Sequence, residues 1–328
     1  MSHAPSPVAV RHLTVDVESD GQRLDNFLLR ELKGVPKSHI YRIIRSGEVR
    51  RNKGRVRADE RVAAGDALRI PPLRVSERAQ EKIDHPAPAR DFPVLYEDDF
   101  FLAIDKPAGV AVHGGSGVSF GVIEQMRQAR PQAPMLELVH RLDRDTSGLL
   151  LIAKKKNALK SLQDQFRSRA TGKTYLALVK GHWPAQLKQL DQPLHKYVLA
   201  DGERRVKVTT AADPDGQYAL TQVRVLKRLT AAAGLAAAPT IGLSLLEVNI
   251  KTGRTHQIRV HLASAGHPIA GDDKYGDFEF NRQWSQCGCK RMFLHAWRLR
   301  LTHPITADAL ELHSELPAAL HIWLQTVA

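Results

Sequence analysis

One short stretch of the chain places charged side chains directly before an apolar strand. In "ELVHRLDRDTSGLLLIAKKK", residues 137–156, Arg141 and Asp143 lie two positions apart, so an extended loop projects both to the same side. Leu142 and the run 149–152 then turn inward. The pattern presents a carboxylate and a cation together at the edge of a rigid strand, and such a carboxylate can act as a nucleophile or a general base. The alternative interpretation is a surface turn with an Asp-Thr-Ser cap.

A second polar cluster follows another apolar strand. "NIKTGRTHQIRVHLASAGHP", residues 249–268, ends a strand near Thr252, turns at Gly253 and begins a helix. Its charged and imidazole side chains lie on that turn and the first helical turns: Arg254, His256, Arg259 and His261. Two dense polar clusters, each beside a hydrophobic strand, predict the facing walls of one cleft.

The elements that must hold these clusters are mainly strands. "VLYEDDFFLAIDKPAGV" predicts two strands, and "KTYLALVKG", "TQVRVLKRL", "LSLLEVNIKTG" and "MFLHAWRLRLTHP" predict four more. Between them, Asn157 can cap a helix whose Leu159, Leu162 and Phe166 form one apolar face. Several strands follow one another directly. We therefore expect an α+β domain with a mixed, mostly antiparallel sheet.

The whole chain is strongly basic. It has 328 residues and a formal net charge of +13, which favours contact with a polyanion: nucleic acid first, an anionic membrane surface second. The N-terminus has no basic segment followed by an apolar run, and the longest aliphatic stretch, 149–153, is too short to span a bilayer. With only two cysteines, Cys287 and Cys289, the chain is expected to be cytoplasmic.

Most of this excess charge lies in one small segment. Residues 23–75 hold 14 basic and 6 acidic side chains, hence eight of the thirteen net positive charges. The pattern predicts two short amphipathic helices followed by a tight β element, "VRRNKGRV". The segment resembles the S4-type RNA-binding module, in which the following side chains would track phosphates: Lys37, Arg42, Arg45, Arg50, Arg51, Lys53 and Arg55. The alternative is a solvated basic face.

Three stretches carry a more specific resemblance. "HRLDRDTSG", "GKTYLALVKG" and "KTGRTHQIRVH" are similar, in the same order, to the signatures of the RluA-type pseudouridine synthases. The resemblance implies a domain with a split, mostly antiparallel sheet, which follows an S4-like domain along the chain. Together with the polar tract 76–90, which has no periodic apolar face and is expected to be a linker, it divides the chain into an N-terminal extension (1–20), an S4-like domain (21–75), this linker and a catalytic domain (91–328).

The same resemblance implies the activity and its residues. Such enzymes isomerise uridine in RNA; the S4-like module favours large-subunit (23S) ribosomal RNA over transfer RNA. Asp143 would be the essential carboxylate, Tyr175 the active-site phenol and Arg259 the partner of Asp143. Arg141 would hold the RNA or fill the space left by a flipped base. Whether Asp143 acts as nucleophile or as base stays open. The alternative for Tyr175 is that it is only a structural residue of a strand, with its side chain in the core.

The reaction implied needs neither redox change nor hydrolysis, so we expect no cofactor and no metal. Cys287 and Cys289 lack the second ligand pair that zinc sites usually have. We expect a monomer, without membrane contact or an obligate protein partner. The competing class is a non-catalytic RNA-binding or ribosome-assembly protein, which would tolerate loss of Asp143, Tyr175 or Arg259; all three are present.

Overall fold

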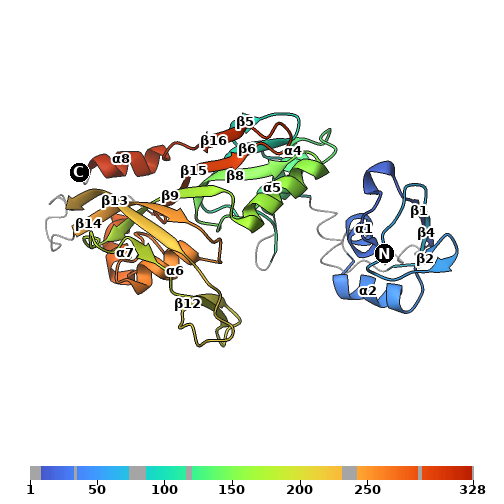
Figure 1. Cartoon of the computed structure of the whole chain (residues 1–328), viewed down its shortest axis with the longest axis horizontal. Helices are drawn as coiled ribbons and strands as arrows, with labels where there is room; N and C mark the ends of the chain where they lie inside the picture. Colours follow the sequence, from blue (N-terminus) through green and yellow to red (C-terminus); the bar gives the residue numbers. More distant parts are fainter. Residues whose placement is uncertain are drawn as a thin grey trace, which may run out of the picture. The chain divides into compact units, whose positions relative to one another are not determined.

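The computed structural model describes residues 9–32, 35–73, 86–115, 120–230, 242–286 and 290–326. The chain divides into two compact units, Met1–Ala87 and Pro88–Ala328 (Figure 1). Most of the expected linker (76–90) and both cysteines, Cys287 and Cys289, lie outside the described residues. Within the described ranges, no helix has the length and apolarity needed to cross a bilayer.

The first unit packs two helices on a four-stranded sheet of order β1-β4-β2-β3. The two predicted amphipathic helices are confirmed: Phe27 and Leu28 of the first and Ile40 and Ile43 of the second are buried in one core. β1 comes from the segment expected as an N-terminal extension and pairs with β4. The elements are β1 Arg11–Thr14, a 3-10 turn Val17–Ser19, α1 Leu24–Glu31, α2 Lys37–Arg45, β2 Arg50–Arg51, β3 Gly54–Arg55 and β4 Ala67–Ile70.

The second unit is built on one large sheet of order β10-β13-β14-β9-β15-β8-β6-β5, with β7 and β16 paired at its side. Every pairing is antiparallel except that of β15 with β8. The predicted α+β class with a mostly antiparallel sheet is confirmed. The strands are β5 Val94–Glu97, β6 Phe101–Lys106, β7 Glu137–Leu138, β8 Ser147–Ala153, β9 Gly172–Lys180, β10 Gln189–Leu190, β13 Thr221–Thr230, β14 Gly242–Ile250, β15 Leu294–Thr302 and β16 Ala309–His313.

Helices cover both faces of this sheet. α4 and α6 pack over two apolar clusters that both include Tyr175, and α5 and the pair α7 and α8 cover separate clusters. Leu162 of α5 is buried as expected, but the predicted cap is wrong: the N-cap is Lys155 without a side-chain bond. The Asn157 oxygen accepts only from the next amide, Ala158 N. The helices are α4 Val122–Ala129, α5 Lys156–Ser168, α6 Gln257–Ser264, α7 Phe278–Gln286 and α8 Ala318–Thr326.

A two-stranded hairpin projects from the body of this unit beyond α6 (Figure 1). It consists of β11 Leu194–Val198 and β12 Arg204–Val208. Leu194 and Val206 are buried against Val260 of α6, so the hairpin is anchored by a small apolar cluster of its own.

Candidate active site

The strand register brings the two sequence clusters together. Tyr175 of β9 pairs with Ala296 of β15, which in turn pairs with Gly148 of β8. Gly148 has φ of +107°, and a Cβ built there would lie 2.2 Å from the Ala296 carbonyl oxygen. Only glycine allows β8 to approach β15 this closely. The loop that carries Asp143 into β8 therefore ends next to Tyr175.

Buried polar side chains hold this loop. The ammonium of Lys106, fully buried, donates to the carbonyls of Arg144, Pro107 and Val110 at 2.8 to 2.9 Å. Burial lowers the pKa of Lys106 to about 7, although the charges of nearby carboxylates act to raise it. The three carbonyls match the three N–H bonds of a charged ammonium. This arrangement fixes the backbone immediately after Asp143.

His140, at the other end of the loop, uses its ring as an acceptor. Its Nε2 accepts from the backbone N–H of Leu151 at 3.1 Å, and the ring stacks on Phe166. Burial lowers the pKa of His140 to about 4. The imidazole is therefore neutral at neutral pH, as an acceptor must be.

Asp143 faces Arg259, but Arg259 is bound mainly to another carboxylate. Its Nη1 lies 3.5 Å from Asp143 Oδ2, whereas its Nε and Nη2 each donate to Asp272 at 2.7 Å. Arg259 and Asp272 are 4% and 1% exposed. Burial lowers the pKa of Arg259, but the bonds and charge of Asp272 outweigh it and the net shift is upward. Asp272 thus sets the orientation of Arg259. The hydrogen bonds and charge of Arg259 in turn hold the pKa of Asp272 below its usual range despite burial.

Two adjoining cavities meet at Asp143 and Arg259. One, of about 90 Å³, is lined by Arg141, Asp143, Tyr175, Arg254 and His256 among others, and the second, of about 540 Å³, opens past Arg144 toward Lys274. The prediction that the two sequence clusters face one another is confirmed. His261 is an exception: it is fully buried, and its ring contacts Thr221 Oγ1 and Gln192 O instead of the cavity.

Tyr175 is half-buried and lines the smaller cavity. Burial, and then the charge of Asp143, raise the pKa of its phenol. The hydroxyl therefore keeps its proton in the resting site. It can donate a hydrogen bond or present its ring for stacking, but it does not start as a phenolate base.

Two residues of the site, Asp272 and Lys106, were not predicted from the sequence, and His256, which belongs to the second polar cluster, was given no role there. Asp272 follows Gly271, whose φ is +75° and where a Cβ would lie 2.2 Å from the Arg291 carbonyl oxygen. His256 has its ring 4.0 Å from Asp143, and Lys106 lies in "AIDKPAGV". A glycine before two acids in "GDDKYG" was the one available signal for Asp272. The buried partner of Arg259 could not be chosen from spacing alone.

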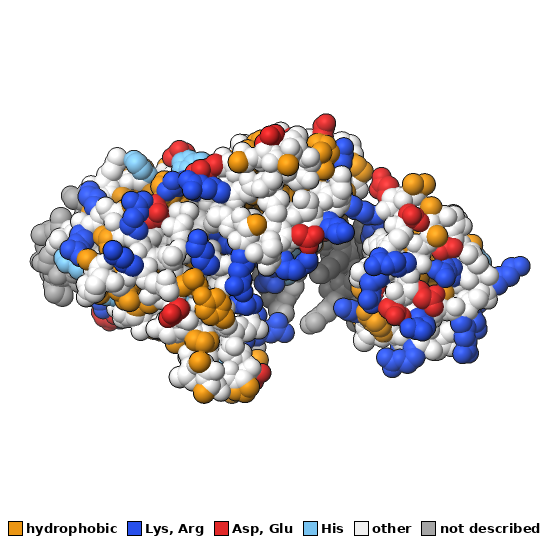
Figure 2. Space-filling view, viewed as in Figure 1, with side chains coloured by type: hydrophobic (Ala, Val, Ile, Leu, Met, Phe, Trp, Pro, Cys, Tyr) orange, Lys and Arg blue, Asp and Glu red, His pale blue; other side chains and the backbone are white. Residues whose placement is uncertain are grey.

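The S4-like unit presents basic side chains to solvent, many of them on the face seen in Figure 2. Of the candidates, Lys37, Arg42, Arg45, Lys53 and Arg55 are exposed. A groove of about 560 Å³ is lined by Arg45, Arg55 and Arg57, the last of which is not among the predicted phosphate contacts. Arg50 is half-buried, as is Arg51, which donates to the Arg61 carbonyl and pairs with Glu60 and Asp66.

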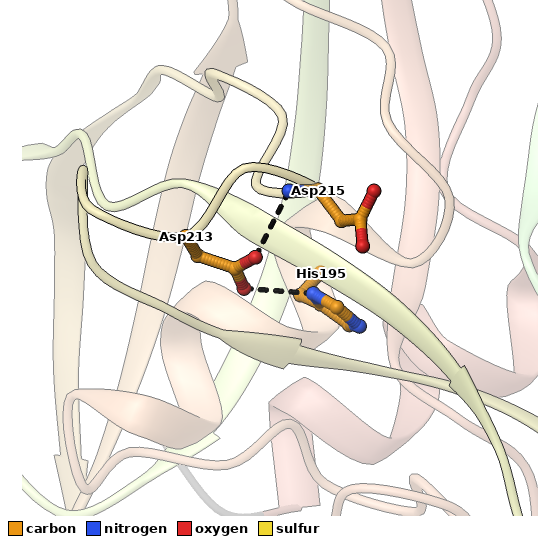
Figure 3. A group of neighbouring side chains, drawn as sticks. All are labelled: His195, Asp213 and Asp215. Carbon is orange, nitrogen blue, oxygen red and sulfur yellow. Dashed lines mark hydrogen bonds and ion pairs between the residues drawn. The ribbon is translucent and has the colours of Figure 1, made fainter.

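Among the described residues, one group of neighbouring side chains has the residue types that can bind a metal ion: His195, Asp213 and Asp215. Figure 3 shows the His195 ring and the Asp215 backbone nitrogen directed at the Asp213 carboxylate. Thr209 Oγ1 donates to the same carboxylate at 2.7 Å. These bonds close the loop after β12, and we assign the group that structural task.

Comparisons with known proteins agree with this geometry. The family model for RNA pseudouridylate synthase matches residues 100–264, and that for the S4 domain matches residues 22–68. Human RNA Pseudouridylate Synthase Domain Containing 4 superposes with a TM-score of 0.55 at 27% identity, over 71% of this chain and 92% of that chain. The chain belongs to the RNA pseudouridylate synthase family and carries an S4 domain.

Among its relatives are proteins named ribosomal large subunit pseudouridine synthase C. The one from Yersinia pestis is 49% identical over 94% of this chain and 92% of its own length. The one from Escherichia coli (strain K12) is 48% identical over 97% of this chain and 96% of its own length.

Proposed function

We propose that this protein isomerises specific uridines to pseudouridine in large-subunit (23S) ribosomal RNA, with Asp143 as the essential carboxylate and without a cofactor. The observation that carries the proposal is the pairing of Asp143 with Arg259 in a cavity that Tyr175 also lines, inside the region matched by the synthase family. The substrate is inferred from the names of the relatives that match nearly the whole chain.

Asp143 acts on the ribose of the target nucleotide. Either of two roles, nucleophile or base, requires an ionised carboxylate with a free oxygen. RNA that fills the cavity removes water, and the guanidinium of Arg259 then stabilises the negative charge of Asp143. Because Asp272 holds two of the three nitrogens of Arg259, the third is aimed at Asp143 at no further cost in side-chain ordering.

Tyr175 stacks on the uracil ring in this proposal, with its proton retained. Arg141, which is exposed and lines both cavities, contacts the RNA or fills the space left when the uridine leaves its stack. The isomerisation breaks the glycosidic bond and rejoins the ribose to C5 of the same base. The hydrogen on C5 leaves as a proton and N1 takes up a proton, so the step needs no electron acceptor and no water as a reactant.

The S4-like unit supplies affinity for the RNA backbone. Five exposed cations, at positions 37, 42, 45, 53 and 55, can displace counterions from phosphates. We further propose that the protein acts as a monomer in the cytoplasm, without an obligate protein partner, because the residues proposed for chemistry all come from one chain.

The test is Asp143→Asn. The amide keeps the shape and much of the hydrogen bonding of the carboxylate but not its charge, so we expect tritium release from C5-labelled uridine in ribosomal RNA to be abolished. RNA binding should stay within about twofold. Substantial turnover by this variant would refute the assignment of Asp143.

The competing class, a non-catalytic RNA-binding protein, predicts a different result. In that case the unaltered protein would release no tritium from any ribosomal RNA fragment, and Asp143→Asn would change nothing. Pseudouridine mapping in cells that lack the chain separates the two classes: specific large-subunit sites should be lost if the proposed function is correct.

A further inference from the structure

The two oxygens of the Asp143 carboxylate have different surroundings. Oδ2 faces two nitrogen donors, Arg259 Nη1 at 3.5 Å and His256 Nε2 at 4.0 Å. Within the described part of the chain, Oδ1 accepts no hydrogen bond, and the shortest approach of each of these two side chains is to Oδ2. The carboxylate is therefore approached from one side, and one oxygen is left toward the cavity.

His256 is placed for this by an unusual backbone. It is the N-cap of α6 and has φ of 53° and ψ of 21°, in the left-handed region. Non-glycine residues in this region are uncommon, and they persist where the surroundings hold them. The side chain is 17% exposed and lines both cavities. Burial lowers the pKa of His256, so the ring is neutral at neutral pH and carries one N–H.

Tyr275 decides which ring nitrogen carries that proton. The backbone N–H of Val206, in β12, donates to Tyr275 Oη at 3.0 Å, and the same oxygen lies 2.8 Å from His256 Nδ1. Burial raises the pKa of Tyr275 to about 12, so the phenol keeps its hydrogen. The hydroxyl oxygen could accept a second time, but Nδ1 is the one acceptor within reach of the phenol hydrogen among the described residues, so the hydroxyl donates its hydrogen to Nδ1. The histidine proton then lies on Nε2, the nitrogen that faces Asp143.

We propose that the hydrogen-bond chain Val206–Tyr275–His256 presents Nε2–H of a neutral histidine to Oδ2 of Asp143, and thereby reserves Oδ1 for the ribose. This rests on the proposed function. His256 is a positioning residue, which acts through Asp143 together with Arg259. The 4.0 Å approach shortens to hydrogen-bond length when the substrate fills the cavity, as catalytic contacts commonly do.

Holding one oxygen matters because Asp143 is otherwise free to turn. Its side chain is 29% exposed, and Arg259 alone contacts it at a single nitrogen. A carboxylate held at one point can rotate about that contact and present either oxygen in many directions. A second donor on the same oxygen removes this freedom as the RNA fills the cavity, which preserves alignment in the reactive complex.

The first test compares His256→Asn with His256→Gln. Asn adopts left-handed backbone readily but is too short to reach Asp143, whereas Gln keeps an N–H donor at about the right distance and fits the backbone less well. We expect kcat to fall about 10- to 100-fold for Asn and less than about fivefold for Gln. KM for the RNA should change less than about threefold for both.

A purely structural role predicts the reverse order, because Gln strains the backbone more than Asn. Asn that retains kcat within threefold of the unaltered protein, or Gln that loses as much as Asn, would overturn the proposal. Thermal unfolding of both variants distinguishes a loss of fold from a loss of positioning: Asn should be at least as stable as Gln.

The second test does not depend on activity. In the full-length protein labelled with ¹⁵N-histidine, the His256 signals are those that disappear in His256→Asn. We expect them to report the Nε2–H tautomer in the unaltered protein and a mixture of tautomers in Tyr275→Phe, with kcat lowered about 5- to 20-fold in the latter. An Nδ1–H tautomer in the unaltered protein would overturn the proposal even if isomerisation is normal. Absence of any isomerisation by that protein would instead refute the proposed function.

Discussion

The two units hold their arginines in opposite ways. In the S4-like unit Arg45 and Arg55 stand in solvent beside an open groove. In the synthase unit Arg259 is 4% exposed and bound through two nitrogens to a carboxylate that is itself 1% exposed. Exposed cations can exchange counterions for phosphates and contribute affinity that salt weakens. A buried cation held by a carboxylate has a fixed position, and what it contributes besides its charge is orientation.

The difference separates affinity from alignment. The first unit can lose a charge and bind RNA more weakly, in proportion to the number of phosphates that it no longer neutralises. The second cannot lose the charge of Asp272 without leaving a buried guanidinium partly unpaired. We therefore expect perturbations of the two units to have different signatures in rate, stability and salt dependence.

The largest effect should follow from Asp272→Asn. Removing one partner of a buried ion pair costs about 3 to 5 kcal/mol, and we expect the lower end because Asn still accepts a hydrogen bond. Arg259 should also turn toward Asp143 and misplace it, which lowers kcat at least about 100-fold. Urea unfolding and single-turnover tritium release measure the two effects.

The matched control is Asp273→Asn. Asp273 contacts the same Nη2 of Arg259 at 3.4 Å but is 69% exposed. Its substitution should therefore leave the free energy of unfolding nearly unchanged and change kcat by less than about twofold. Equal behaviour of the two variants would show that orientation of Arg259 by a buried carboxylate is unimportant.

A chain that begins at Pro88, where the second unit starts, should bind RNA less tightly but react almost normally once bound. Each phosphate that the shortened chain leaves unneutralised lowers the slope of log K against log salt by somewhat under one unit. Single-turnover rates at saturating enzyme should fall by less than about tenfold, or roughly 1.4 kcal/mol of barrier. Titration against a ribosomal RNA fragment at several salt concentrations measures both quantities.

In the full chain, Arg45→Gln and Arg51→Gln form a control pair for this separation. Arg45 is exposed, so its substitution should lower the salt slope, whereas substitution of Arg51, which is bound to Glu60 and Asp66, should leave the slope nearly unchanged.

For the chain that begins at Pro88, a saturated rate that collapses without the first unit would mean that this unit helps to build the active complex.

A smaller effect should appear as pH dependence of stability at His140. Its pKa falls from 6.5 in the unfolded chain to about 4 in the folded protein. Between these values the unfolded chain binds a proton that the folded protein does not. The stability that the neutral His140 ring contributes to the folded protein is therefore fully present above pH 6.5 and is lost as pH falls toward 4.

His140→Phe keeps the stacking on Phe166 but has no titrating ring. The stability advantage of the unaltered protein over this variant should therefore shrink by about 2 kcal/mol between pH 7.5 and 4.5, because each pKa unit corresponds to about 1.4 kcal/mol. Urea unfolding at several pH values measures this. Parallel stability curves would show that His140 does not stay neutral in the folded protein.

The smallest effect is expected from chelation. With the RNA fold maintained by monovalent salt, removal of divalent ions should leave the rate within about twofold, because the proposed chemistry uses only side chains. Loss of activity that a single transition metal restores would point to Cys287 and Cys289 or to the loop of His195 and Asp213. Substitution of either set would then identify the ligands.

Much of the architecture could be predicted from local patterns. Period-two and helical spacing of apolar residues indicated the sheet and the two S4 helices, because burial of one face acts on every residue of an element. Local signals failed at two positions on helices. Asn157 has the right type for a cap, yet its oxygen bonds the adjacent amide while α5 starts at Lys156. His261 lies on the same helix as Arg259 but two residues further along, on a face that is buried away from the cavity.

By itself the sequence determined which residue types were present in "HRLDRDTSG", "GKTYLALVKG" and "KTGRTHQIRVH", and hence that a carboxylate, a phenol and a guanidinium were candidates for one site. Only the tertiary structure decided how these groups are oriented. Asp272 claims two nitrogens of Arg259, and Tyr275 assigns the proton of His256, across separations of 13 and 19 residues. The reason is physical: a hydrogen bond requires a donor–acceptor distance correct to within a few tenths of an ångström and a suitable angle. Both are set by chain segments that meet only when the sheet and helices have packed.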